Sequence, residues 1–236
     1  MRSLLLAAVT ALAGLAGASA LAGDKPLVVL ELYTSQGCSN CPPADALVAE
    51  LASREDVLPL ALHVDYWDYI GWPDNFARPE NTARQKAYAR VAGHGSIFTP
   101  QIVIGGVDHV VGFKPMKVAD LLQAHGARPE PVEVEVEWQG DTLKITCAPR
   151  DDAVLPAKMT VDLVRYQREA TVNIRHGENA GETISYANIV LGWDRVGSWT
   201  GAGLFEVSAP APGDGPLAVI VQEDGPGRVI SALRVR

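Results

Sequence analysis

The residues of this chain best suited to chemistry are two cysteines three positions apart, Cys38 and Cys41, in the run CSNC. A helical pattern begins directly after them, so both thiols are expected at a helix N-terminus. There the helix dipole and the free N–H groups stabilise a thiolate and lower the pKa of its thiol. Cys38 is the expected nucleophile towards a partner disulfide, and Cys41 is expected to resolve the mixed disulfide.

Two other interpretations of this pair stay open. A zinc site would need two further ligands, and neither a second CxxC nor a histidine pair of suitable spacing follows. A structural disulfide is the second alternative, although secreted domains held by disulfides usually carry more cysteines, in even numbers, than the three found here. The third cysteine, Cys147, shares an alternating face with apolar residues and is expected to be an inert core thiol. Redox chemistry is therefore the favoured interpretation.

The elements that would position the pair follow from the hydrophobic pattern of the first half of the chain. Short apolar runs predict strands, and a 3.6-residue periodicity predicts helices. The predicted strands are 27–33, 57–64, 101–104 and 107–111, and the predicted helices are 41–53, 81–92 and 115–125. Their order, β-α-β-α-β-β-α, is the plan of a thioredoxin fold with the CxxC at the start of the first helix.

A proline stands directly before the third predicted strand, in the dipeptide Thr99-Pro100. In thioredoxin folds a cis-proline at this point lies against the CxxC and offers its backbone to an extended substrate. Pro100 is therefore assigned to the catalytic set and Thr99 to substrate binding. The alternative is an ordinary trans-proline that opens a strand.

Three ionisable residues lie near the predicted site. Glu31 is inside the first strand, where thioredoxin-like proteins often keep a buried acid; burial raises the pKa of a carboxyl, and Glu31 is predicted to take the proton of Cys41. In the alternative, Glu31 faces polar loop atoms. His63, at the end of the second strand, would help a thiol lose its proton, bind copper beside the thiolates, or be a satisfied core residue. Asp45, one turn after Cys41, is expected on the helix surface.

An aromatic-rich segment follows the second strand, with Tyr66, Trp67, Tyr69, Trp72 and Phe76. This density would form a groove for an unfolded or extended partner beside the CxxC, bound through Trp67, Tyr69 and Trp72. The other interpretation is packing against the second half of the chain.

The pattern changes to period two after a linker rich in glycine and proline, 126–131. The strand candidates beyond it are 132–138, 143–147, 159–166, 171–175, 203–208, 216–222 and 228–235. We therefore expect a thioredoxin-like α/β domain over 23–126, followed by an all-β, sandwich-like domain over 131–236. The polar segment 175–181 is expected to be a solvated hairpin loop.

The N-terminus has the layout of a secretory signal peptide over residues 1–22, with Arg2, an apolar run and small residues before a cleavage site. The apolar run is shorter than the roughly 20 residues that span a bilayer, which favours cleavage over a membrane anchor. The mature protein is then expected in the periplasm or secreted. A net charge of −8 argues against nucleic acid and anionic lipid as partners, so protein thiols or disulfides are the expected partners.

Several segments resemble a family of exported bacterial proteins of unknown function in the thioredoxin-like superfamily. They are TSQGCSNCPPAD (34–45), HVDYWDYIGW (63–72), TARQKAYA (82–89), TPQIVIGG (99–106) and IRHGENAGETISYANIV (174–190). The resemblance implies a thioredoxin-like fold and a CxxC redox motif, to which Cys38, Cys41 and Pro100 correspond residue by residue. It implies no substrate.

Three functions therefore stay open. The first is an exported thiol–disulfide oxidoreductase that needs no cofactor beyond its own Cys38–Cys41 disulfide. The second is a copper-binding module in which the two thiolates act with His63. The third is a non-catalytic interaction protein in which the CxxC is a structural disulfide.

Overall fold

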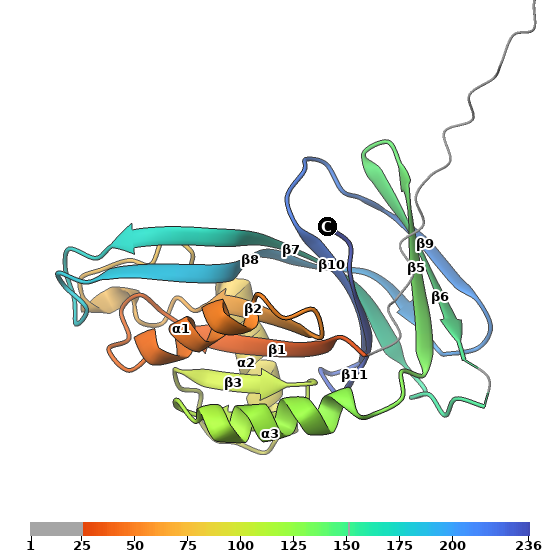
Figure 1. The fold of residues 1–236 in the computed structure, drawn as a ribbon, viewed down its shortest axis with the longest axis horizontal. Helices are drawn as coiled ribbons and strands as arrows, with labels where there is room; N and C mark the ends of the chain where they lie inside the picture. Colours follow the sequence, from red (N-terminus) through yellow and green to blue (C-terminus); the bar gives the residue numbers. More distant parts are fainter. Residues whose placement is uncertain (1–25, 151) are drawn as a thin grey trace, which may run out of the picture.

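The computed structural model describes residues 26–150 and 152–236, so the predicted signal peptide lies outside the described residues. The elements, shown in Figure 1, are β1 (Val28–Thr34), α1 (Pro42–Leu51), β2 (Val57–His63), a 3₁₀ turn (Asp68–Ile70), α2 (Pro79–Val91), β3 (Gln101–Ile104), β4 (Asp108–Val111), α3 (Pro115–Gly126), β5 (Val132–Gln139), β6 (Thr142–Pro149), β7 (Met159–Asn173), β8 (Thr183–Trp199), β9 (Phe205–Pro210), β10 (Leu217–Glu223) and β11 (Val229–Arg234). In the first half, the predicted order of strands and helices is confirmed. Within the described part of the chain, no helix is both long and apolar enough to cross a membrane.

The strands form a large mixed sheet, in the order β11-β10-β7-β8-β2-β1-β3-β4, and a separate antiparallel sheet, β5-β6-β9. β1 and β2 are parallel and in register, so that Thr34 pairs with His63 at their carboxyl ends. β3 is antiparallel to β1 and begins at the same edge, where Gln101 pairs with Tyr33. The segments that follow β1 and β2 and the segment that precedes β3 therefore meet at one edge of the sheet.

The helices cover both faces of this part of the sheet. Since successive side chains of a strand point to opposite faces, neighbouring residues of β1 contact different helices. Leu30 and Leu32 of β1 share a core with α1 and α3, to which the helices contribute Ala44, Val48, Leu51, Val118 and Leu122. Tyr33 of β1 lies in a second core with Tyr88 of α2. The face of a β1 residue thus decides whether it lies near α1, the helix that carries the cysteine pair.

The second half of the chain consists of strands in its described part, in agreement with the prediction, but these strands divide between the two sheets. β5, β6 and β9 make the separate sheet, whereas β7, β8, β10 and β11 continue the large one. In the large sheet, the strands of the first half of the chain join those of the second half where Ala61 of β2 pairs with Ile189 of β8. The two sheets share a core that includes Val134, Ile145 and Leu163.

Two long strands, β7 and β8, were not foreseen in this form. The predicted strands 159–166 and 171–175 are parts of one 15-residue strand, because the polar residues between them continue the ladder to β8. The sequence predicts no strand over the 17 residues of β8, because Asn188 and Gly192 interrupt its apolar pattern. In the structure Asn188 has a φ of 49°. In Figure 1 the two strands run together to a tip at the end of the molecule where α1 begins.

Candidate functional site

Cys38 and Cys41 are joined by a disulfide at the N-terminus of α1. Cys41 is the N-cap residue, and its carbonyl oxygen accepts the backbone N–H groups of Ala44 and Asp45. Pro42 follows at the first helical position, where a missing N–H leaves no bond unmade. Both cysteines are buried: Cys38 is 2% exposed and Cys41 is 0% exposed.

Pro100 lies at the same edge of the sheet as the disulfide. The Thr99–Pro100 peptide bond is cis, as its place before β3 predicted. The indole N–H of Trp67 donates a hydrogen bond of 2.7 Å to the hydroxyl of Thr99. Trp67 also lies beside the turn that leads to Cys38: a Cβ placed on Gly37 would be 3.3 Å from the Cβ of Trp67. Thr99 and Trp67 are thus brought to the disulfide turn, residues 35–41.

The aromatic loop, residues 65–76, is tied to this turn through Gln36, which is fully buried. Trp72 donates its indole N–H to Oε1 of Gln36 at 2.8 Å, and the backbone N–H of Gln36 donates to Oδ2 of Asp74 at 2.8 Å. The ring of Tyr69 stacks on that of Trp67, and Tyr69 is 81% exposed. The structure therefore places Trp67 and Trp72 against the turn and leaves Tyr69 open at the surface beside it.

Glu31 is on the other side of the sheet from the cysteine pair. It points to the α2 face, where its carboxylate accepts hydrogen bonds from Arg84 at 2.7 and 2.8 Å. The hydroxyls of Tyr33 and Tyr88 donate to the same carboxylate at 2.9 and 2.6 Å. The sheet separates Glu31 from Cys41. Glu31 is therefore not in a position to take the proton of Cys41, the role that the sequence predicts for it.

Asp45 is the carboxyl that lies on the side of Cys41. The two residues are four positions apart on α1, a spacing that places side chains on one face of a helix. Asp45 is 2% exposed, so the expected surface position is wrong, and neither of its oxygens has a hydrogen-bond partner among the described residues. Burial raises the pKa of Asp45 to about 7, although His63 and Thr34 favour its charged form. Such a carboxyl takes up and releases a proton near neutral pH.

His63 extends this buried cluster. Its Nδ1 is 2.7 Å from Oδ2 of Asp74, whereas its Nε2 has no partner among the described residues. The ring of Tyr186 from β8 packs edge-on against it, 4.8 Å between centroids, and the Tyr186 hydroxyl is also unpartnered. His63 is thus a core residue satisfied at one nitrogen. Buried polar atoms are normally paired, so the unpaired atoms of Asp45, His63 and Tyr186 mark this cluster as a candidate for proton transfer.

The connection between β7 and β8, residues 174–182, also reaches the disulfide turn; we call it the strap. Asn179 donates its side-chain N–H groups to the carbonyl oxygens of Gln36, at 2.8 Å, and Cys38, at 3.1 Å. The hydroxyl of Ser39 donates to Glu178 at 2.7 Å. Residues 175–181 of the strap were expected to be a solvated loop. Most of these residues are exposed or half-buried, but Asn179 is buried, as is Ile174 at the start of the strap.

The remaining predicted groups lie elsewhere. Cys147 is a buried free thiol in the core between the sheets, and burial raises the pKa of this thiol to about 12. In the part of the chain that the structure describes, no group of three or more His, Cys, Asp or Glu side chains is arranged to hold a metal ion. His63 and the two cysteines therefore do not form such a group.

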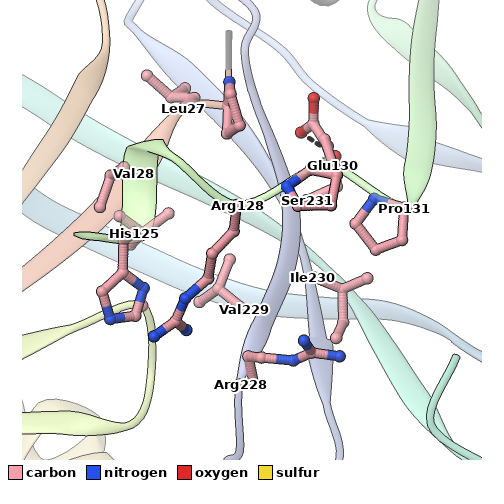
Figure 2. Close-up of a pocket in the computed structure, with 14 residues that line it drawn as sticks. Leu27, Val28, His125, Arg128, Glu130, Pro131, Arg228, Val229, Ile230 and Ser231 are labelled. Carbon is pink, nitrogen blue, oxygen red and sulfur yellow. Dashed lines mark hydrogen bonds between the residues drawn. The ribbon is translucent and has the colours of Figure 1, made fainter. Parts of the chain in front are cut away.

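A small cavity of about 60 Å³ lies where β1 begins, far along the strand from the disulfide. Figure 2 shows that His125, Arg128, Arg228 and Ser231 line it, from the end of α3, the linker, the turn before β11 and β11 itself. None of the predicted site residues lines this cavity. The candidate site is thus identified by its side-chain chemistry and not by a pocket.

Comparison with known proteins gives a family and two solved structures. A family model described as a protein of unknown function, DUF1223, matches residues 29–222. The crystal structure of an Agrobacterium tumefaciens protein is 33% identical in sequence, covers 90% of this chain and 95% of that chain, and has a TM-score of 0.76. HBP35 of Porphyromonas gingivalis is similar in fold alone, at 17% identity, with 89% and 74% of the two chains covered and a TM-score of 0.62. No curated protein matches this sequence.

Proposed function

Because the chain belongs to the DUF1223 family, whose function is unknown, we propose a function from the site itself: an exported thiol–disulfide oxidoreductase. The observation that supports it most strongly is the Cys38–Cys41 disulfide at the start of α1, on the same helix face as the buried, unpartnered carboxyl of Asp45. A helix N-terminus lowers the pKa of the first thiol of such a pair. A carboxyl that titrates near neutral pH would accept the proton of the second.

The arrangement of the first half supports a thioredoxin-like assignment. β1, α1 and β2 form a parallel unit, which is followed by the antiparallel pair β3–β4 and by α3. In the sheet order β2-β1-β3-β4 the start of α1 and Pro100 lie at one edge, which supports the proposal of a substrate-binding CxxC site there. We propose that Thr99, Trp67 and Tyr69 contact the partner at this edge.

The proposed reaction begins on the reduced pair. The Cys38 thiolate attacks one sulfur of a partner disulfide, forms a new S–S bond and releases the partner's other sulfur as a thiolate. The Cys41 thiol then gives its proton to the Asp45 carboxylate and attacks the sulfur of Cys38. The partner's second sulfur leaves as a thiolate, and the Cys38–Cys41 disulfide forms. The partner gains two electrons and the pair loses two, so the proposal calls for no further cofactor; the reverse sequence oxidises the partner.

We propose that the protein works outside the cytoplasm, on protein thiols or disulfides. This rests on the signal-peptide pattern of residues 1–22. It also agrees with a cysteine pair in the disulfide form, because disulfides persist in oxidising compartments.

The test is the reduction of insulin disulfides by the mature protein, with dithiothreitol as the electron donor. We expect turnover by the wild type and by Cys147→Ser, the matched control that removes the third cysteine, and none by Cys38→Ser. Cys41→Ser should accumulate a mixed disulfide with insulin, visible by mass spectrometry, because the resolving thiol is missing. Equal turnover by Cys38→Ser and the wild type would overturn the proposal.

A further inference from the structure

The disulfide is closed to partners in this structure. A thiolate that reduces it must approach a sulfur along the S–S bond that it breaks, yet Cys38 is 2% exposed and Cys41 is 0% exposed. Two segments pack around the disulfide turn, the aromatic loop of the first half and the strap of the second half. For the proposed function, at least one of them must move.

The strap is held to the turn mainly by Asn179. Its amide group carries two N–H donors, and it donates to two carbonyl oxygens of the turn, those of Gln36 and Cys38. Asn179 is 6% exposed, so breaking these bonds without replacement leaves buried polar groups unpaired, which is costly. The contact joins residues 141 to 143 positions apart in the chain.

The rest of the strap is held more weakly. The bond between Ser39 and Glu178 is exposed to solvent, and the neighbouring ends of the two strands, 167–173 and 183–185, consist of exposed or half-buried residues. Segments with few buried apolar contacts open locally at low cost. Gly177, at a φ of 79°, allows the strap to approach Trp72, because a Cβ there would be 3.3 Å from the Cβ of Trp72. Within the strap, Ile174 is buried at its base, 2% exposed, and the ring of His176 lies 6.3 Å from that of Trp72. Between these contacts, Asn179 is the strap residue that bonds to the disulfide turn from a buried position.

We propose that the strap is a gate over the Cys38–Cys41 disulfide and that Asn179 is its latch, a positioning residue that sets how often the sulfur of Cys38 becomes accessible. Opening breaks the two Asn179 bonds, which leaves the carbonyl oxygen of Gln36 without its Asn179 donor and that of Cys38 with the N–H of Cys41 alone. Both oxygens can then accept a further N–H group, which the backbone of a polypeptide partner supplies. The gate thus favours polypeptide partners over small thiols that lack such donors. This inference rests on the proposed function, since it names the class of partner for the same cysteine pair.

The test is the rate at which excess dithiothreitol, which has no N–H donor, reduces the disulfide of the oxidised protein, followed by alkylation and mass. Asn179→Ala should be reduced about tenfold faster than the wild type or more, because both latch bonds are lost. The control Glu178→Gln lies on the same strap and keeps an acceptor for Ser39, so its rate should stay within about twofold. Equal rates for Asn179→Ala and the wild type would overturn the gate.

Hydrogen exchange of the wild type provides a second measurement, which holds even if Asn179→Ala does not fold. The amides of the strap should exchange much faster than those of β7 and β8 at residues 161–164 and 193–197. Equal protection of both regions would show that the strap does not open and would contradict the proposal.

The gate and the proposed function fail separately. Faster reduction of Asn179→Ala without insulin turnover by the wild type would support the gate and overturn the oxidoreductase. Insulin turnover with equal reduction rates would overturn the gate alone.

Discussion

Replacing Asp45 by asparagine tests the proton-accepting cluster, because the amide has nearly the shape of the carboxyl but does not titrate. The pKa of Asp45 rises from 3.8 to about 7 in the folded protein, chiefly through burial. Between these values the folded state binds more protons than the unfolded state, so ionising Asp45 destabilises the fold progressively as the pH rises from about 4 to 7. The whole difference corresponds to about 4 kcal/mol, of which about 3 kcal/mol falls between pH 5 and pH 8.

The assay is urea unfolding of the oxidised wild type and of Asp45→Asn at pH 5, 6.5 and 8. Taking the difference between the two proteins at each pH cancels the titration of all other groups. We expect the free energy of unfolding of Asp45→Asn, relative to that of the wild type, to increase by about 3 kcal/mol from pH 5 to pH 8. At the same time the step in which Cys41 resolves a mixed disulfide should slow by about 10²-fold near pH 7, since general-base assistance is lost.

Glu31→Gln is the matched control, because Glu31 is a buried carboxyl on the opposite face of the sheet. It should leave the pH dependence of the resolving step unchanged. If the stability difference between Asp45→Asn and the wild type is the same at pH 5 and pH 8, Asp45 does not titrate in this range and the reasoning is refuted.

Three further predictions concern the surroundings of the site. Arg84→Met should lower the free energy of unfolding in urea by about 3–5 kcal/mol, because it leaves Glu31 as an unpaired buried charge; a loss below about 1 kcal/mol would contradict the assigned ion pair. Cys147 should resist iodoacetamide at pH 8 in the folded protein and react in urea, since burial raises the pKa of its thiol to about 12; rapid labelling of the native state would speak against this burial. Gly177→Ala should destabilise the protein by about 1–2 kcal/mol, because its φ of 79° and its contact with Trp72 suit glycine alone; unchanged stability in urea would show that the strap does not need the close approach.

The first half of the fold follows from local patterns in the sequence. Alternation and helical periodicity locate β1 to α3, and the parallel pairing of β1 with β2 then brings the cysteine pair and the segment after His63 to one edge. The position of Pro100 at that edge follows from the same order of elements. Each of these features follows from a pattern within a single short segment and from the order of those segments in the chain.

The assignment of the buried acid illustrates what local patterns miss. Glu31 and Asp45 are both near the cysteine pair in sequence, and alternation along β1 decides that Glu31 points to α2. The four-residue spacing of Cys41 and Asp45 shows that they share a helix face, but not that this face is covered. It is covered by β8, which contributes Ala187 to the core of α1 and Tyr186 to the cluster at His63. Since β8 was not predicted, the burial of Asp45 was not predictable either.

Asn179 shows the same limit for the strap. It is a polar residue in a turn rich in glycine and charge, for which a solvated loop is the ordinary expectation. Its role depends on two contacts with residues more than 140 positions away, Gln36 and Cys38. No pattern within the segment 174–182 carries that information.

The reduction potential of the Cys38–Cys41 pair tests the central claim most directly. The mature protein would be equilibrated in glutathione buffers, and the free thiols counted by alkylation and mass spectrometry. The proposed oxidoreductase predicts a potential between about −120 and −270 mV, the range of catalytic pairs. A potential below about −300 mV, typical of structural disulfides, would contradict it and favour a structural role for the Cys38–Cys41 disulfide.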